Sequence, residues 1–179
     1  MDFSETGLKV AGFLGFVAFA DLPTTDVPRE PGVYVVLRTD TEPPCFREHS
    51  PAGRFKAKDP SVDQAALERA WVPGAAVIYI GKAGRSGRAA RGLMKRLDEY
   101  RRHGSGQRIG HWGGRYIWQL ADSDQLLAAW KTTPDQNPED VESQLIHDFE
   151  SAYGCLPFAN LSGDSGSRPA RQTADAQVP

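Results

Sequence analysis

The sequence predicts an α+β domain in which a small antiparallel sheet of three or more strands is flanked by helices. Two runs rich in β-branched residues, 32–38 and 75–81, are bounded by turn residues and are typical of buried strands. Two later segments, 88–102 and 138–153, place apolar residues at helical spacing. The 179 residues suit one domain, and 40% hydrophobic against 25% charged residues allow a core without disulfide or metal support.

The first apolar stretch, residues 10–20, is expected to be a strand or loop packed on this domain. The residues before it carry two acidic side chains, Asp2 and Glu5, and one basic side chain, Lys9, whereas a secretory signal begins with positive charge. The run is also too short to span a bilayer. Two distant cysteines without CxxC spacing favour a reducing compartment. The sequence therefore predicts a cytoplasmic protein that does not associate with membranes, with secretion as the open alternative.

An insertion, residues 40–74, lies between the two buried strands and carries five prolines, several charges and a short predicted helix at 63–71. The second strand leads into a glycine-rich loop, 81–87, and then into a helix expected at 88–102 and ended by Gly104. The loop lacks the residue order of a phosphate-binding P-loop, so its glycines alone are weak grounds for phosphate contact.

The C-terminal part is predicted to add two strands and one helix. Residues 116–120 and 126–130 are expected to form a pair of strands. Asn137 suits a helix N-cap, Pro138 suits the first turn, and Gly154 suits the end of the helix. Residues 1–161 then form a single domain, and the Ser-, Gly- and Ala-rich segment 162–179 is predicted to be a disordered tail.

The formal net charge of −2 conceals an uneven distribution. Residues 82–108 hold nine basic and two acidic side chains, whereas residues 109–164 hold two basic and nine acidic ones. The overall balance excludes a wholly basic, histone-like binder, but the basic block indicates a site for a polyanion, next to a segment that could hold a cation. A solvated, arginine-rich helix remains the other interpretation.

Three residues carry polar groups where the surrounding pattern is apolar. Glu142 shares a helix face with Leu145 and Phe149, which is costly unless its carboxylate is paired or binds a cation. Glu142 could instead lie in the first turn and only complement the helix dipole. Tyr34 and Tyr79 lie in mid-strand, either as catalytic groups or as core tyrosines with one hydrogen bond each.

Five segments in a fixed order resemble the GIY-YIG nuclease family. They resemble, in turn, its two tyrosine motifs, its arginine helix, its metal-binding glutamate and its closing glycine, proline and asparagine. The segments are Gly32-Val-Tyr34, Tyr79-Ile-Gly81-Lys82-Ala83, the helical run Leu93 to Tyr100, Glu142-Ser-Gln-Leu-Ile146 and Gly154-Cys-Leu-Pro-Phe-Ala-Asn160. In the simplest members of the family a short hairpin joins the two tyrosine strands, so the insertion in this chain is a departure. Some restriction-type members also carry an insertion at this place.

The resemblance implies a compact domain that hydrolyses DNA phosphodiester bonds with one divalent cation, Mg²⁺ or Mn²⁺. A cation near a tyrosine favours the phenolate, which an unperturbed tyrosine with a pKa of about 10 rarely reaches at neutral pH. At two further positions of these motifs, Lys82 and Tyr100 resemble the residues of repair excision nucleases. In the implied roles, Glu142 binds the metal ion, Tyr34 or Tyr79 deprotonates the attacking water, Arg96 stabilises charge on the phosphate, and Asn160 holds the metal site or the phosphate.

The basic block supplies the expected DNA contacts. A stripe of cations would follow the phosphate backbone with salt-dependent, largely sequence-independent affinity. His111, in the loop 104–114, is expected to approach the substrate, with a surface histidine as the alternative. Four cations of the insertion, Arg47, Arg54, Lys56 and Lys58, either contact DNA or are solvated. The predicted DNA-binding residues are Arg85, Arg88, Arg91, Lys95, Arg102 and His111.

Three functions remain open on the sequence alone. The first is an endonuclease, which would be a homodimer if one active site per chain is to cut both strands. The second is a DNA-binding module of the same fold without efficient catalysis. The third is a small-nucleotide phosphodiesterase, which has no need of a continuous basic stripe. Every polar residue that the family resemblance leads us to expect is present, which favours the nuclease over the binding module.

Overall fold

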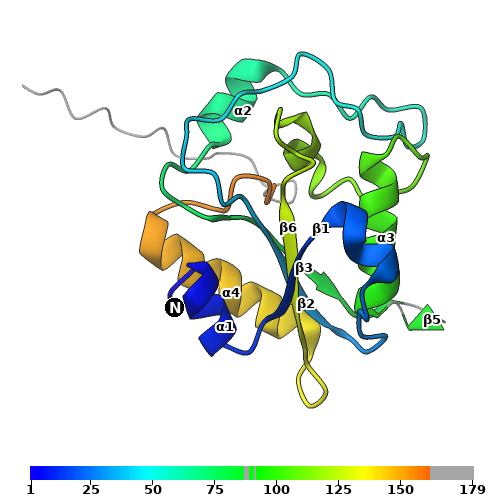
Figure 1. Ribbon diagram of the computed structural model, residues 1–179, viewed down its shortest axis with the longest axis vertical. Helices are drawn as coiled ribbons and strands as arrows, with labels where there is room; N and C mark the ends of the chain where they lie inside the picture. The colour runs from blue at the N-terminus through cyan, green and yellow to red at the C-terminus, as the bar shows by residue number, and fades with distance from the viewer. Residues whose placement is uncertain (87–88, 91, 162–179) are drawn as a thin grey trace, which may run out of the picture.

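A computed structural model of the protein describes residues 1–86, 89–90 and 92–161, and it describes 85–86 and 89–90 by backbone alone (Figure 1). Four strands form one antiparallel sheet in the order β1-β6-β2-β3. The short strands β4 (Arg85–Ser86) and β5 (Ala89–Ala90) pair separately. The sheet strands are β1 (Leu14–Ala18), β2 (Gly32–Leu37), β3 (Val77–Ala83) and β6 (Leu127–Thr132). Together with the helices below, they confirm the predicted α+β fold.

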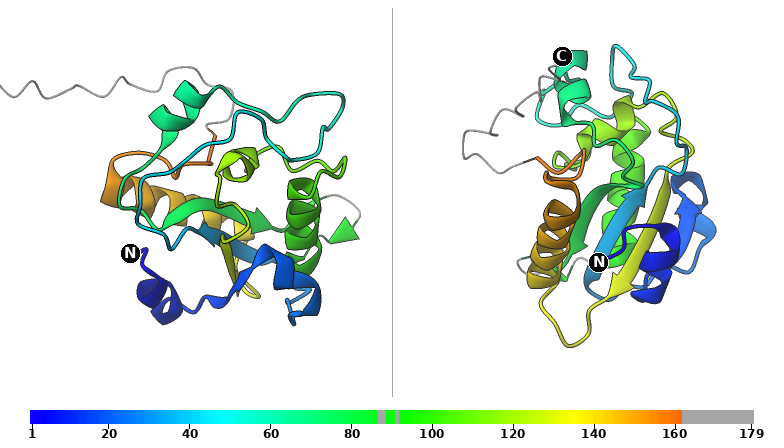
Figure 2. Two further views of the ribbon diagram at one scale, coloured as in Figure 1. Left: turned by 45° about the horizontal axis from the view of Figure 1, so that its top comes forward. Right: turned by 90° about the vertical axis from the view of Figure 1, so that its left-hand side faces the viewer.

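Helices cover both faces of this sheet (Figure 2). Successive strand residues point to opposite faces, so Val33 and Val35 enter one core cluster while Tyr34 and Val36 enter the other. The first cluster is completed by α1 (Glu5–Val10) and α4 (Pro138–Tyr153). The second is completed by α2 (Gln64–Ala70), α3 (Leu93–Gly104) and two 3₁₀ turns, η1 (Phe19–Thr24) and η2 (Arg115–Gln119).

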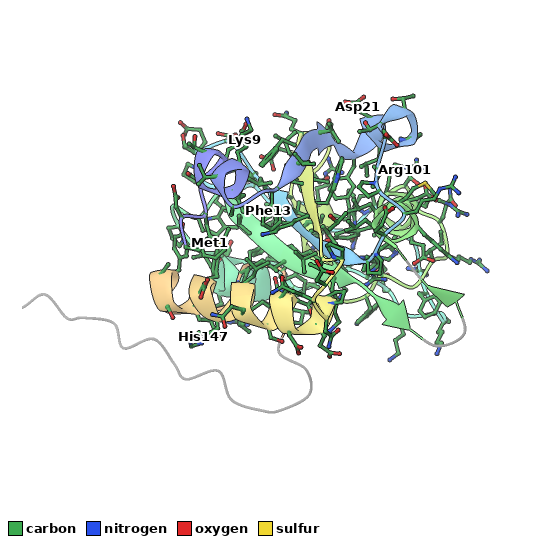
Figure 3. All side chains as sticks on the ribbon, turned by 90° about the horizontal axis from the view of Figure 1, so that it is seen from below. Met1, Lys9, Phe13, Asp21, Arg101 and His147 are labelled. Carbon is green, nitrogen blue, oxygen red and sulfur yellow. The ribbon has the colours of Figure 1, made fainter. Side chains whose placement is uncertain are left out.

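The helix α4 begins and ends where the sequence predicts. The Asn137 side chain accepts a hydrogen bond from the Glu139 amide, and Gly154, at φ 72°, ends the helix in the left-handed conformation. Leu145 and Phe149 pack against the sheet. His147 points away from it on the outer side of α4 (Figure 3). Glu139 and Asp140, the acidic residues of the first turn, therefore lie at the N-terminal end of α4.

The arginine helix α3 begins five residues later than the predicted 88–102. Its first backbone amides are satisfied by a preceding segment, since Leu93 N donates to Glu30 O (3.0 Å) and Met94 N donates to Pro28 O (2.8 Å). A Cβ at Gly92 would overlap the Arg29 carbonyl oxygen, so the close approach requires glycine. This backbone contact, which no local sequence pattern encodes, sets the start of the helix.

The predicted strand at 116–120 is wrong, because this segment forms the 3₁₀ turn η2. The predicted strand at 126–130 is confirmed as β6, but it pairs with β1 and β2. The side chain of Gln119, which is 1% exposed, accepts from Val62 N (2.8 Å) and donates to Arg47 O (2.9 Å). The segment therefore fastens the insertion to the core and does not join the sheet.

The insertion has no core of its own. Its predicted helix is confirmed as α2. Its buried residues Ala52, Leu67 and Ala70 belong to the cluster that also contains α3, and its buried Val72 belongs to the cluster that contains α4. In the N-terminal stretch, where the sequence predicts a strand or a loop, the structure has the strand β1, whereas α1 and η1 on either side of it were not predicted. Among the helices that the structure describes, none has the length and apolar character needed to cross a membrane.

Candidate active site

Tyr34 and Tyr79 lie on the neighbouring strands β2 and β3 and face α3. Tyr34 pairs with Gly81, and Val36 pairs with Tyr79, so both tyrosines share one face of the sheet. Their ring centroids are 5.9 Å apart. A Cβ at Gly81 would lie 2.7 Å from Tyr34 Oη and 2.8 Å from Tyr79 Cε1. The glycine of the second motif therefore makes room for the hydroxyl of the first.

Tyr100 and His111 close an aromatic cluster over these two residues. Tyr34 Oη lies 3.0 Å from His111 Nε2, and the His111 ring stacks on Tyr100 with a centroid distance of 3.6 Å. The Tyr100 hydroxyl donates to Gly114 O (2.6 Å), so it anchors the loop that carries His111. All four side chains are buried, and Tyr34 has no exposed surface. We therefore assign Tyr100 a positioning role.

The position of His111 differs from the predicted one. As a DNA-binding residue it was expected to reach the substrate, but it is 1% exposed and packs between Tyr34 and Tyr100. Among the residues that the structure describes, none other than His111 itself offers its Nδ1 a hydrogen-bond partner. Aromatic stacking and the bond to Tyr34 draw the ring inward, and the loop around it covers the tyrosines.

The charges around the cluster come from helices on opposite faces of the sheet. Burial raises the pKa of Tyr34 and raises that of Tyr79 well above 10. The positive charge of Arg96, on α3, opposes this rise for both tyrosines, whereas Glu142, on α4, adds to it. Both charged groups therefore act electrostatically on both phenols, although Glu142 lies on the α4 side of the sheet and the phenols lie on the α3 side.

Lys82 connects the sheet to α4. It pairs with Val33 in the sheet and so points to the face that α4 covers. Its Nζ lies 2.9 Å from Glu142 Oε2 and 3.0 Å from Glu139 Oε1. Burial lowers the pKa of Lys82, but hydrogen bonds and charges from the two carboxylates outweigh this and leave the pKa raised. Glu139 was not predicted, although its spacing of three residues from Glu142 on a helix places both on one face.

The carboxylates fit a divalent cation by charge and donor type. Within the described ranges, no group of three or more His, Cys, Asp or Glu side chains is suited to hold a metal ion. Mg²⁺ commonly uses only one or two carboxylates, with waters and substrate phosphates as its other ligands. Glu142, whose side chain is 18% exposed, and Glu139 already hold one cation, the Lys82 ammonium. A metal ion here would share Glu142 with Lys82.

Asn160 binds the backbone of β3. Its Oδ1 accepts from Ile80 N (2.9 Å) and its Nδ2 donates to Ile80 O (2.8 Å). The amide is therefore engaged at both ends next to Tyr79 and Gly81. This arrangement assigns Asn160 a role in positioning the strand, whereas the predicted role was to hold the metal site or the phosphate.

Part of the predicted basic stripe lies within the described structure. Lys95 is exposed, and Arg102 is partly exposed, with its Nε donating to Gln107 Oε1 (2.7 Å). Arg88 and Arg91 lie outside the described residues, as does the side chain of Arg85. Arg101 reaches the surface at the far side of the molecule from α4 (Figure 3). Lys95 is therefore an exposed cation of α3, whereas Arg96 and Arg102 are partly compensated by Glu99 (3.9 Å) and Asp98 (3.7 Å).

The burial of His111 predicts a pH-dependent stability. Burial, together with the charge of Arg96, holds the pKa of His111 well below 6.5, and burial also lowers that of His103. Below pH 6.5 the unfolded chain takes up protons that the folded His111 does not, so stability falls as the pH falls, by up to about 1.4 kcal/mol per pH unit for each such histidine. Urea unfolding from pH 7 to 5 measures this slope, which His111→Gln should reduce. An unchanged slope in that variant would contradict the assignment to His111.

Comparisons with known proteins add no family assignment. No protein-family model, no curated protein and no solved structure matches the chain.

Proposed function

We propose that the protein is a metal-dependent endonuclease that hydrolyses DNA phosphodiester bonds. The observation that carries this proposal is the meeting of Tyr34 and Tyr79 at Gly81, with the charges of Arg96 on α3 and of Glu142 on α4 near enough to act on both phenols. A guanidinium, a carboxylate and a phenol are the groups needed to neutralise a phosphate, bind a cation and activate water. The five segments that resemble GIY-YIG nucleases, in the same order along the chain, support the same reaction.

The hydrogen bond to His111 favours Tyr34 over Tyr79 as the general base. Burial and Arg96 keep His111 neutral at pH 7, so its Nε2 can accept the hydrogen bond of the Tyr34 hydroxyl and orient it. Burial raises the pKa of Tyr34 and raises that of Tyr79 well above 10, while Arg96 and a bound divalent cation would favour the phenolate. Once the Tyr34 proton has been lost to solvent, the phenolate takes a proton from the attacking water, and the hydroxide formed attacks phosphorus. For water to reach Tyr34, the loop that covers it must move.

The remaining groups act on the phosphate. Arg96, whose side chain is 25% exposed, is placed to hold a phosphate oxygen and to offset the charge that develops on it. Lys82 orients Glu142, and Asn160 holds β3 in register. A bound divalent cation would supply charge neutralisation and lower the pKa of its own water. The proposal includes DNA as the partner, a cytoplasmic location, and a homodimer where both strands are cut.

Cleavage of supercoiled plasmid with Mg²⁺ or Mn²⁺ tests the proposal. Glu142→Gln should reduce nicking at least about 100-fold, because it removes the carboxylate charge that would hold the cation. Glu139→Gln is the matched control on the same helix face, since its more exposed carboxylate also contacts Lys82, and it should retain most activity. Calorimetry with Mn²⁺ alone should show binding to the wild type and not to Glu142→Gln. Absence of nicking by the wild type over a range of salt and metal concentrations would refute the nuclease.

One observation favours a second candidate, a DNA-binding module without catalysis. Tyr34 is fully buried, and Glu142 is already paired with Lys82, as expected if the site were only structural. Such a module would bind duplex DNA without nicking it, and Glu142→Gln would leave its affinity unchanged in the presence of Mg²⁺. The plasmid and binding assays together separate the two functions.

A further inference from the structure

A groove of about 680 Å³ lies outside the tyrosine cluster, between the insertion and the segment that follows α3. Three of the residues that line it, Arg54, Lys56 and Arg108, are cationic, and no acidic residue lines it within the described part of the chain. In Figure 1 the insertion, drawn in cyan, arches above the sheet and meets the green segment after α3 on the right. The cations thus come from two segments far apart in the sequence.

Tertiary contacts hold the two walls of this groove together. Gly53 N donates to His103 O (2.8 Å), and a Cβ at Gly53 would overlap the Gln107 carbonyl oxygen. Phe55 packs so closely on Gly110 that a Cβ there would lie 3.0 Å from Phe55 Cζ. The groove is therefore built by close packing of backbone against backbone.

A strained turn presents Lys56 at the groove. Lys58 N donates to Phe55 O (3.0 Å), which closes a four-residue turn, and its two central residues, Lys56 (φ 51°) and Ala57 (φ 61°), are both left-handed. Asparagine and glycine are the residues that such a turn favours, and strain of this kind is typically kept where it serves a function. The turn holds a lysine where glycine or asparagine would be more stable.

The charge of the groove is only partly compensated. Arg54 pairs with Asp59 (2.7 Å), but both side chains are at least half exposed, so the pair is weak and screened by water. With three cations against this one carboxylate, the groove keeps a positive potential. Arg102, which bonds Gln107 beside one wall and lies 3.7 Å from Asp98 Oδ2, adds a partly compensated cation between the groove and α3.

We propose that this groove binds the sugar–phosphate backbone of DNA beside the cleavage site. The inference rests on the proposed function and names a surface by which the substrate is held. One wall of the groove continues into the loop that carries His111, which contacts Tyr34. A backbone held by Lys56 and Arg108 would therefore lie next to the loop that covers the general base.

Fluorescence anisotropy with a labelled DNA duplex, measured at several NaCl concentrations without Mg²⁺, tests the proposal. The double variant Lys56→Asn with Arg108→Gln removes two proposed phosphate contacts. Asparagine is chosen at position 56 because the turn favours it. We expect at least 10-fold weaker binding at low salt, and a slope of log K against log salt that is shallower by about two, since each phosphate contact contributes about 0.9. Arg69→Gln, which removes an exposed cation on α2, is the matched control and should bind as the wild type does.

A second comparison separates charge from backbone conformation. Ala57→Asn changes the same turn and keeps Lys56, so an equal loss of binding in this variant would mean that the turn shape matters and would overturn the phosphate contact. Unchanged affinity and slope in the double variant would overturn it as well.

Plasmid nicking, measured in parallel, distinguishes the failure of the two proposals. If the wild type nicks DNA while the double variant binds and cleaves normally, the groove proposal fails and the nuclease stands. If the wild type never nicks DNA while the double variant binds weakly, the groove stands and the nuclease fails.

Discussion

Replacing Gly81 with alanine should destabilise the protein by about 1–3 kcal/mol and abolish cleavage, because the added methyl group has no room. Its Cβ would meet Tyr34 Oη at 2.7 Å and Tyr79 Cε1 at 2.8 Å. Both rings are buried under Tyr100 and His111, so neither can move without disturbing that cluster. The same change therefore affects stability and both candidate bases at once.

Urea unfolding and plasmid nicking measure the two effects of Gly81→Ala. Gly84→Ala is the matched control three residues later, where a Cβ would lie 3.6 Å from Pro138 Cγ in ordinary contact. We expect this control to change the free energy of unfolding and the nicking rate little. A Gly81→Ala protein with wild-type stability and activity would show that the tyrosines do not need the close packing seen here.

The second large effect is expected for Tyr34→Phe, which removes the proposed general base and keeps the ring. General-base catalysis typically contributes 10²- to 10⁴-fold, so nicking should fall by roughly that factor. The stability cost should be about 1–3 kcal/mol, because the change leaves the buried His111 Nε2 without its hydrogen-bond partner.

Tyr100→Phe is the matched comparison for Tyr34→Phe. It also removes one buried phenol hydroxyl with one hydrogen bond, here to Gly114 O, so its stability cost should be similar. Because that hydroxyl bonds a backbone carbonyl, the loss of nicking should be much smaller. A larger loss in Tyr79→Phe than in Tyr34→Phe would move the role of general base to Tyr79.

Much of the fold could be predicted because local signals agree with tertiary packing. The strands β2 and β3 are continuous apolar runs, and α4 has a cap, a first-turn proline and a terminal glycine. The errors arose where a distant backbone decides local structure. Pro28 and Glu30 determine the start of α3, and the insertion engages Gln119 in η2. These contacts join residues that are far apart in the sequence, so no window along the chain contains both partners.

The same distinction applies to the site. Tyr34, Tyr79 and Glu142 were identifiable because each breaks an apolar strand or helix pattern. The structure packs the two tyrosines together and pairs Glu142 with Lys82 on the other face of the sheet. The burial of His111 had a weaker signal, the glycines 113 and 114 that let its loop approach Tyr79 and Tyr100. The amide of Asn160 gave no sign that it would bond backbone instead of a ligand, because this depends on the geometry of β3.

The bonds from Asn160 to β3 also affect the order in which the protein folds. β3 is the outer strand of the sheet, and an open strand edge invites pairing with other chains. Residues 159 and 160 occupy this edge, where Ala159 N donates to Ile78 O (2.9 Å), yet Asn160 lies 80 residues beyond its partner Ile80. During synthesis the edge stays open until this segment has left the ribosome, so a chain that stops before Ala159 should aggregate through β3.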